Sequence, residues 1–335
     1  MKKIYIVTGA TGFVGGNLVK KLVEKGKTVY AFVRSKEKAD IVLKGLPVKL
    51  FFGDIRDKAA FCKMFDDNTA EFVVINTAAV VLIGGTRKEY REMTNVNING
   101  VKNVIECCLE HKVRLVHVSS VHAIREPKKR ALTVETENFD PKFVHGLYAK
   151  SKAQASAIVM DAIKNRGLKA IMVHPGGITG PGDYGNSHLT QMVIDYLAGK
   201  IPAGTSGGYD FVDVRDVCDG ILLAEEKGSL GNCYLLTNRY YSVKQLLDYL
   251  YELSSYKKIN LVLPMWVARL GLPFLVMAAK ISGKRPLYTS YSLYTLRSNS
   301  NYTHEKASRE LGYKPRELKE SLKDTIDFVK THLST

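Results

Sequence analysis

The sequence predicts an α/β fold, in which a doubly wound parallel sheet is followed by a smaller and mostly helical C-terminal region. Short apolar runs of strand length alternate with stretches of helical spacing through the first half of the chain, as in a parallel sheet covered on both faces. The second half is less regular. We therefore expect the sheet domain at 1–180, with 209–237 returning to it, and a second region at 181–335.

Six apolar runs are expected to form the strands of the first half. They are Lys3–Thr8, Thr28–Val33, Val48–Phe52, Phe72–Asn76, Arg114–Val118 and Leu168–His174. Between them, apolar residues recur every three or four positions, which predicts amphipathic helices. The clearest of these helices are Phe13–Lys25, Arg87–His111 and Ala149–Arg166.

The second half begins with Pro175–Gly185, which is rich in Gly and Pro and is expected to be a loop. The expected elements that follow are helices at Asn186–Gly199, Asp216–Lys227 and Ser242–Leu253 and a short strand at Asn232–Thr237, which would return to the first sheet. Ser242 is a good N-cap residue. The tail has two helical patterns, split at Gly312–Pro315.

Composition excludes several classes of protein. The 335 residues are 45% hydrophobic and 24% charged, which excludes a wholly disordered chain. The five cysteines are an odd number without a CxxC pair, which argues against a disulfide scaffold or a zinc ribbon and for a reducing compartment. No signal-peptide cleavage region follows the N-terminal apolar run. We therefore expect a cytoplasmic protein without a metal site.

A glycine-rich turn follows the first expected strand and opens the first helix. It reads Thr8-Gly9-Ala10-Thr11-Gly12-Phe13-Val14-Gly15. Glycine lets the backbone turn sharply and approach a pyrophosphate, which then lies on the free amides of the helix N-terminus. Because the turn joins a strand to a helix in an alternating pattern, it predicts a dinucleotide-binding Rossmann domain.

With this spacing the chain resembles the extended short-chain dehydrogenase/reductase family, nearly from end to end. Its pattern is most similar to dihydroflavonol reductases and 3β-hydroxysteroid dehydrogenases. The further landmarks are Gly53-Asp54-Ile55, Asn76-Thr77-Ala78-Ala79, Asn97-Ile98-Asn99-Gly100, Ser119-Ser120, Tyr148-x-x-x-Lys152 and His174-Pro175-Gly176-Gly177-Ile178. The resemblance implies that the cofactor is held by Gly9, Thr11, Gly12, Phe13, Val14, Gly15, Asp54, Ile55, Ala78, Ala79, Tyr148, Lys152, Pro175, Gly177 and Ile178.

The residue at the end of the second strand indicates which dinucleotide binds. An acidic residue there accepts from the ribose of NAD, whereas an arginine accommodates the 2′-phosphate of NADP. This chain has Arg34, with Lys36 and Lys38 close behind it. The alternative is that Arg34 is a solvated surface charge. We expect NADP(H), with NAD(H) as the alternative.

The Tyr-x-x-x-Lys spacing places both side chains on one face of a helix. The chain contains it four times, at Tyr148/Lys152, Tyr196/Lys200, Tyr240/Lys244 and Tyr302/Lys306. Only Tyr148 begins a long helix between the fifth and sixth strands, where parallel sheets place their ligands. The resemblance implies that Tyr148 is the acid/base, that Lys152 lowers its pKa and that Ser120 polarises the reacting oxygen.

Two positions of this catalytic set stay open. Ser119 is an alternative to Ser120. Asn97 would organise the proton path, or it would be a capping or helix-bonding asparagine. The histidines of the chain are spread along the sequence without metal-ligand spacing.

The family includes both nucleotide-sugar epimerases or dehydratases and ketone reductases. Sugar-nucleotide members usually carry an arginine just before the stretch Phe211–Asp216, where this chain has Gly207-Gly208-Tyr209-Asp210. Arg215 fits a structural role better, and Lys200, Arg297 or another basic residue is the alternative partner for a diphosphate. We therefore expect an oxidoreductase that interconverts a ketone and a secondary alcohol on a bulky apolar substrate. The alternatives are an epimerase or dehydratase with tightly bound NAD, and a non-catalytic dinucleotide sensor. No motif supports nucleic-acid binding.

The positive charge concentrates around the most apolar stretch. The net charge is +16, and the 52 residues between Glu252 and Glu305 hold seven Lys and Arg and no acidic residue. Residues 261–279 are apolar apart from Arg269, so they fit a buried helix pair, a substrate lid or a membrane contact. We expect a small apolar or amphipathic substrate and a possible peripheral membrane contact through 257–285. A homodimer through Arg87–His111 and Ala149–Arg166 is a further expectation.

Overall fold

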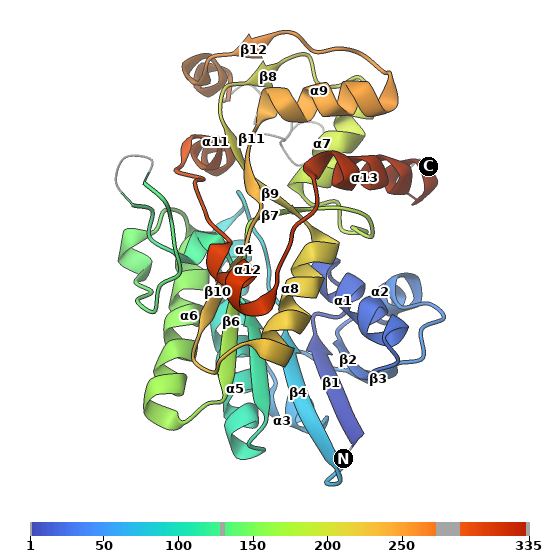
Figure 1. Ribbon diagram of the computed structural model, residues 1–335, viewed down its shortest axis with the longest axis vertical. Coiled ribbons are helices and arrows are strands. Elements are labelled where there is room, and N and C mark those ends of the chain that lie inside the picture. Colours follow the sequence, from blue (N-terminus) through green and yellow to red (C-terminus); the bar gives the residue numbers. More distant parts are fainter. Residues whose placement is uncertain (1, 128–130, 273–288, 333–335) are drawn as a thin grey trace.

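A seven-stranded parallel sheet forms the lower half of the molecule, with the strand order β10–β6–β5–β4–β1–β2–β3 (Figure 1). Its strands are β1 (Lys2–Thr8), β2 (Thr28–Val33), β3 (Lys49–Phe52), β4 (Ala70–Asn76), β5 (Arg114–Val118), β6 (Ala170–Pro175) and β10 (Cys233–Leu236). The computed structural model describes residues 2–127, 131–272 and 289–332. The doubly wound sheet predicted from the sequence is therefore confirmed.

Helices cover both faces of this sheet. They are α1 (Phe13–Glu24), α2 (Lys36–Val42), α3 (Lys58–Cys62), α4 (Arg87–Thr94), α5 (Val101–Glu110), α6 (Leu147–Arg166) and α8 (Val214–Lys227). Alternate residues of β1 enter opposite cores: Ile4 and Ile6 pack with the α3, α5 and α6 side, and Tyr5 and Val7 with the α1 and α8 side. Burial on both faces explains why the strands read as continuous apolar runs.

The expected helix Arg87–His111 contains a local widening. A π-helical turn, Asn95–Gly100, lies between α4 and α5. Such turns occur often at functional sites. This one carries Asn97 towards the sheet edge, where its side chain is buried.

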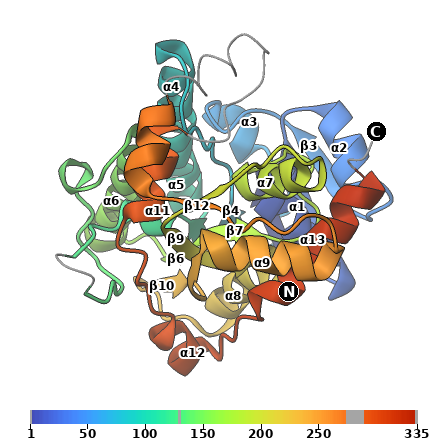
Figure 2. The same ribbon diagram turned by 90° about the horizontal axis from the view of Figure 1, so that it is seen from above.

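The second region lies above the C-terminal edge of the sheet (Figures 1 and 2). It contains a three-stranded sheet, β11 (Arg239–Ser242), β9 (Gly208–Asp213) and β7 (Gly177–Thr179), and a short pair, β8 (Gly204–Thr205) and β12 (Val262–Leu263). Its helices are α7 (His188–Leu197), α9 (Val243–Ser254), α11 (Ser290–Arg297) and α13 (Leu318–His332), whereas α12 (Glu305–Leu311) packs on α8 and β10 of the large sheet. Ser242 caps α9 through a capping box, as its residue type predicts.

The expectation of a loop over Pro175–Gly185 was wrong at β7. Gly177–Thr179 pairs in parallel with β9. A Cβ at Gly176 would lie 2.7 Å from Asp210 Oδ1, and a Cβ at Gly177 would lie 3.0 Å from Tyr209 and Phe211. These glycines therefore allow β9 to approach closely, which composition alone cannot distinguish from a turn.

Residues 209–237 divide between the two sheets. β10 pairs with β6 and so returns to the first sheet, and α8 packs on that sheet beside α1. β9 instead belongs to the three-stranded sheet. The chain therefore passes between the two regions several times.

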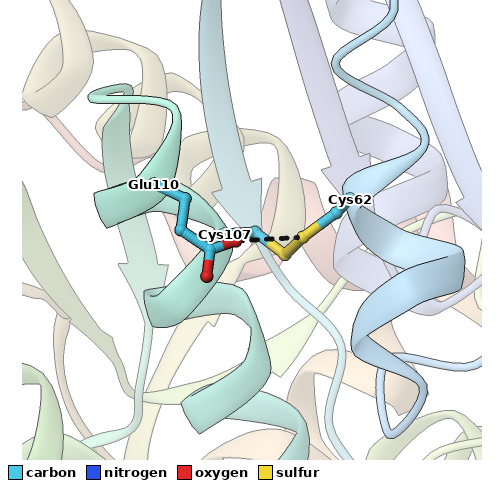
Figure 3. A group of neighbouring side chains, drawn as sticks. All are labelled: Cys62, Cys107 and Glu110. Atoms are coloured by element: carbon cyan, nitrogen blue, oxygen red, sulfur yellow. Dashed lines mark hydrogen bonds between the residues drawn. A yellow bond between two sulfur atoms is a disulfide. The ribbon is translucent and has the colours of Figure 1, made fainter.

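One disulfide joins α3 to α5 (Figure 3). Cys62 and Cys107 are 45 residues apart in sequence, and their Cα atoms are 5.7 Å apart. Glu110 lies next to the pair. Cys108, Cys218 and Cys233 are free and buried. The cysteine spacing did not predict this bridge, because the packing of α3 on α5 brings the two residues together.

The apolar stretch 261–279 is described only in part. β12 and a helix over 265–272 lie within the described residues, whereas 273–279 lie outside them. In the part of the chain that the structure describes, no helix has both the length and the apolar character needed to cross a membrane.

Candidate active site

The glycine-rich turn leaves room for a phosphate group. Gly9 has a φ of +64°, and a Cβ there would lie 2.8 Å from the Cα of Ala78. A Cβ at Gly15 would lie 2.1 Å from the carbonyl oxygen of Gly9. Gly12 begins α1 without any side-chain cap and is exposed, with Thr11, Phe13 and Val14 beside it. The free amides of this helix end fit a pyrophosphate.

A row of buried hydrogen bonds fixes the ends of three neighbouring strands. The amide of Ala78 donates to Thr8 Oγ1 over 3.3 Å, and Thr8 Oγ1 donates to Asn76 Oδ1 over 2.6 Å. Asn76 Nδ2 lies 3.1 Å from His117 Nδ1. Burial lowers the pKa of His117, so its imidazole is neutral. Sequence reasoning missed this network, although all three polar side chains stand at or near strand ends.

Asp54, Ile55 and Arg34 lie at the far end of the same edge. Asp54 accepts hydrogen bonds from the side chain of Arg56, which lower the pKa of the carboxyl group. Ile55 is buried, and its carbonyl accepts from Asn103 on α5. Arg34 directly follows β2 with 59% of its side chain exposed, and its Nη1 lies 3.7 Å from Asp54 Oδ2. The guanidinium is therefore solvent-accessible but already paired with a carboxylate.

The remaining expected cofactor residues lie on nearby segments. Ala78 and Ala79 follow β4, Pro175 ends β6, and Gly177 and Ile178 belong to β7. All except Pro175 are partly or fully exposed to solvent. They therefore line the edge between the two regions.

Tyr148 and Lys152 lie one turn apart near the start of α6 and are both buried. Lys152 Nζ donates to the carbonyl of Val118 at the end of β5, over 2.9 Å. Ser120 follows β5, accepts from the amide of His122 over 3.2 Å, and lies close enough to the hydroxyl of Tyr148 to influence the pKa of that phenol. The structure thus brings the three expected catalytic residues together.

Burial dominates the electrostatics of this group. It raises the pKa of Tyr148 to about 12, although the hydrogen bond with Ser120 opposes the rise. It also lowers the pKa of Lys152 to about 8. Both shifts have one cause, because a charged group is disfavoured where water is excluded. A positive nicotinamide bound beside them would favour the phenolate and oppose the rise at Tyr148.

The two serines after β5 have different partners. Ser119 Oγ lies 2.6 Å from Ser156 Oγ on α6, and both residues are buried. Ser120 is the serine that contacts Tyr148. The geometry therefore favours Ser120 over Ser119 as the group that polarises the reacting oxygen.

Asn97 is held by other contacts. Its Oδ1 accepts from the amide of Val80 over 2.8 Å. Its Nδ2 donates to the carbonyl of Val80 over 3.0 Å and to Ser151 Oγ over 3.1 Å. In this structure Asn97 thus ties the segment after β4 to α6, which is neither the cap nor the bond within its own helix that the sequence left as the alternative, and its part in a proton path stays a prediction.

The other Tyr-x-x-x-Lys pairs have different surroundings. Tyr196 donates to the carbonyl of Lys257, and Tyr240 is exposed. Lys306 Nζ donates to Asn232 Oδ1, so it is not placed as a catalytic partner of Tyr302. Of the four pairs, Tyr148 and Lys152 are therefore the pair that lies beside Ser120 at this edge of the sheet.

Sequence reasoning missed three aromatic residues beside Tyr148. His122 contacts Tyr148 edge-on, with 5.9 Å between the ring centroids. Its ring also contacts Tyr209 of β9 and Tyr291 of α11. In the sequence, His122 stands two residues after Ser120 and Tyr291 belongs to a run of tyrosines spaced three apart that we interpret as core or interface, whereas no pattern marked Tyr209.

Comparisons with known proteins agree with this geometry. A model of the NAD dependent epimerase/dehydratase family matches residues 5–236. Sterol demethylase protein B of Methylococcus capsulatus is 30% identical over 331 residues, which cover 97% of this chain and 98% of that protein. A putative dihydroflavonol 4-reductase of Synechocystis is 27% identical over 340 residues, covering 99% and 96% of the two chains.

Two further proteins complete the comparison. The 3beta-hydroxysteroid-dehydrogenase/decarboxylase isoform 1 of Arabidopsis thaliana is 28% identical and covers 96% of this chain and 78% of its own. The crystal structure of gox2253 has a TM-score of 0.84 and 27% identity, and covers 98% of both chains. The chain therefore belongs to the NAD-dependent epimerase/dehydratase family and is an NAD(P)-dependent oxidoreductase of the extended short-chain dehydrogenase/reductase type.

Proposed function

We propose that the protein interconverts a ketone and a secondary alcohol on a bulky, mostly apolar substrate, with NADP(H) as cofactor. The observation that carries the proposal is the buried contact of Ser120 with Tyr148, one helical turn from Lys152. When bound, the dinucleotide supplies or takes up the hydride. The protein supplies the proton and the hydrogen bonds to the reacting oxygen.

Each residue of the group has one task. Tyr148 gives its proton to the carbonyl oxygen in reduction, or takes one from the hydroxyl in oxidation. Ser120 donates a hydrogen bond to the same oxygen while charge develops on it. Lys152, as an ammonium, favours the phenolate of Tyr148 and so keeps the proton transfer reversible.

Three lines of support favour an apolar substrate. The names of similar proteins refer to a sterol, a dihydroflavonol and a 3β-hydroxysteroid. The stretch after α9 exposes Leu261, Trp266 and Leu270. Arg215, the arginine nearest to the position used by sugar-nucleotide enzymes, pairs with Asp213 and Asp324 instead. A diphosphate would have to displace those carboxylates, so the epimerase alternative is disfavoured.

The cofactor preference rests on Arg34. Arg34 directly follows β2, and its exposed guanidinium can form two parallel, charge-assisted hydrogen bonds with the 2′-phosphate of NADP(H). Lys36 and Lys38 are exposed beside it. NAD(H) is the alternative.

Two partner proposals concern the surface of the protein. Basic Lys257, Lys258 and Arg269 accompany the exposed apolar side chains of 261–270, which suits a peripheral contact with an anionic membrane.

A homodimer through the helices α5 and α6 stays a prediction, and light scattering at several protein concentrations tests it.

The activity is tested by following NADPH absorbance with four probes: dihydrotestosterone, a dihydroflavonol, an aromatic aldehyde and a nucleotide-sugar. Turnover of the steroid or the flavonoid is expected. Conversion of the nucleotide-sugar alone, seen by chromatography without any net change in NADPH absorbance and with cofactor released only on denaturation, would support the epimerase alternative instead.

The role of Tyr148 is tested by Tyr148→Phe. Loss of the acid/base should lower kcat by about 10²- to 10⁴-fold, while NADPH affinity stays close to that of the wild type. Tyr240→Phe is the matched control, because it removes an exposed hydroxyl from another Tyr-x-x-x-Lys pair. Retained activity in Tyr148→Phe would contradict the assignment.

A further inference from the structure

The hydroxyl of Ser120 is held by the turn that follows it. Ser120 precedes a short 3₁₀ turn, Val121–Ala123, and its Oγ accepts a hydrogen bond from the amide of His122 over 3.2 Å. A hydroxyl has one proton to donate and two lone pairs. Because the amide uses a lone pair, the proton of Ser120 is left to be donated to the reacting oxygen.

The main chain of Ser120 is fixed as well. Its carbonyl accepts from the amide of Ala123 over 3.0 Å and lies 3.1 Å from Nδ1 of His174, a buried residue of β6. The ring of His174 stacks on Phe139. The large sheet therefore holds the main chain at Ser120, whereas the direction of its hydroxyl depends on where the amide of His122 lies.

The side chain of His122 is held by the second region of the molecule. Its Nδ1 lies 3.2 Å from the hydroxyl of Tyr291 on α11, and its Nε2 lies 3.1 Å from the hydroxyl of Tyr209 on β9. The imidazole also stacks on the ring of Tyr209, with 5.6 Å between the ring centroids. Both nitrogens therefore have a phenol partner, and each phenol comes from a different element.

The imidazole can satisfy both phenols at once. Burial lowers the pKa of His122 to about 4, so the ring is neutral at physiological pH. A neutral imidazole has one N–H and one lone pair. One phenol therefore donates to the ring while the other accepts from it, and the ring is gripped from both sides.

Tyr291 reaches this position because residue 146 is a glycine. Gly146 has a φ of +91°, and a Cβ there would lie 2.1 Å from the ring of Tyr291. Gly146 directly precedes α6, two residues before Tyr148. The helix α11 therefore packs on the segment from which the catalytic helix begins.

We infer that His122 is a positioning residue, which makes the orientation of the Ser120 hydroxyl depend on the docking of β9 and α11. The inference rests on the role of Ser120 proposed above. The two phenols hold the imidazole, the imidazole holds the main chain of its own turn, and the amide of His122 holds Oγ of Ser120. Loss of either phenol should therefore reach Ser120 without any change to the serine itself.

The first test uses NADPH and dihydrotestosterone. Tyr209→Phe and Tyr291→Phe each remove one phenol hydroxyl and should lower kcat about 3- to 10-fold, the range for one hydrogen bond, with NADPH affinity near wild type. Tyr294→Phe is the matched control, because this tyrosine lies on the same helix as Tyr291 but donates to Glu126 instead of His122. Its kcat should stay near wild type, and an equal loss there would overturn the inference.

A Ser120→Ala background separates positioning from a purely structural role. In that background the same two tyrosine substitutions should lower the residual kcat about 2-fold or less, because the group through which they act is absent. Losses as large as those in the wild-type background would overturn the inference, since a structural effect does not need the serine.

A further measurement needs no substrate. Hydrogen exchange at the amide of His122, followed by NMR, should become faster in Ser120→Ala, which lacks the acceptor. It should also become about 3- to 10-fold faster in Tyr209→Phe and Tyr291→Phe, and stay at the wild-type rate in Tyr294→Phe. Wild-type exchange in both Tyr209→Phe and Tyr291→Phe would overturn the inference. If the wild-type protein turns over none of the probes, the proposed function fails, and the exchange rates alone decide whether these tyrosines position the turn.

Discussion

At the scale of single residues, burial separates the functional side chains from the many copies of the same types elsewhere. Ser120, Tyr148 and Lys152 are all buried, whereas Tyr240 of a competing pair is exposed. A buried phenol and a buried amine both resist ionisation. Their pKa values therefore depend on what binds beside them, which couples proton transfer to cofactor binding.

The proposed preference for NADP(H) rests on one exposed residue, Arg34. Arg34→Ala should weaken NADPH binding by about 10- to 100-fold, the range for hydrogen bonds to a charged group, and leave NADH binding nearly unchanged. Fluorescence titration of the two cofactors measures both affinities. Lys36→Ala is the control, and its effect should be smaller because Arg34 alone can form a fork with the phosphate. Equal losses for NADH and NADPH in Arg34→Ala would contradict NADP(H) preference.

Lys152 predicts a pH effect with a definite sign. Lys152→Met removes an ammonium one turn from Tyr148, so the phenolate loses a favourable charge and the pKa of Tyr148 rises. The oxidation rate requires the phenolate, so its pH profile should move to higher pH, with kcat reduced about 100-fold at neutral pH. The profile is measured with epiandrosterone and NADP⁺.

The matched control for this pH effect is Lys150→Met, an exposed lysine on the same helix. It should leave the profile in place. A profile that moves to lower pH in Lys152→Met would show that Lys152 does not stabilise the phenolate.

At the scale of elements, the sequence predicted the parallel sheet, its flanking helices and the split tail, because each follows from local periodicity. It also located Tyr148 and Ser120 through their places after particular strands. It did not predict β7 or the partnership of Tyr209 and Tyr291 with His122. Those contacts join β9 and α11 to the turn after β5, and no local pattern records which distant elements meet.

The disulfide between α3 and α5 predicts a redox-dependent stability. Closing a loop of 45 residues contributes up to about 4 kcal/mol in the chain-entropy model. Wild-type protein should therefore unfold at a lower denaturant concentration when a thiol reductant is present. Cys62→Ser should unfold at a similarly low concentration with or without reductant. Wild-type curves that coincide in both conditions would show that the bridge does not form in solution.

At the scale of the whole molecule, the basic charge and the exposed apolar side chains lie on the same stretch after α9. Leu261, Trp266 and Leu270 are each more than half exposed, at 58%, 65% and 67%. If this surface meets a membrane, co-sedimentation with vesicles should increase with the fraction of anionic lipid and decrease with salt. Trp266→Ala should weaken the binding. Binding that does not respond to anionic lipid would remove the membrane proposal.

The passage of the chain back and forth between its two regions has a consequence for any attempt to divide it. In the sequence, the last strand of the large sheet, β10, follows β7, α7, β8 and β9 of the upper region. Further along the chain, α12 packs on β10 and α8. No single cut releases either region as a continuous piece. A fragment that stops near residue 180 would expose β6 as an unpaired apolar edge, which invites aggregation. We therefore expect the two regions to fold only as parts of one continuous chain.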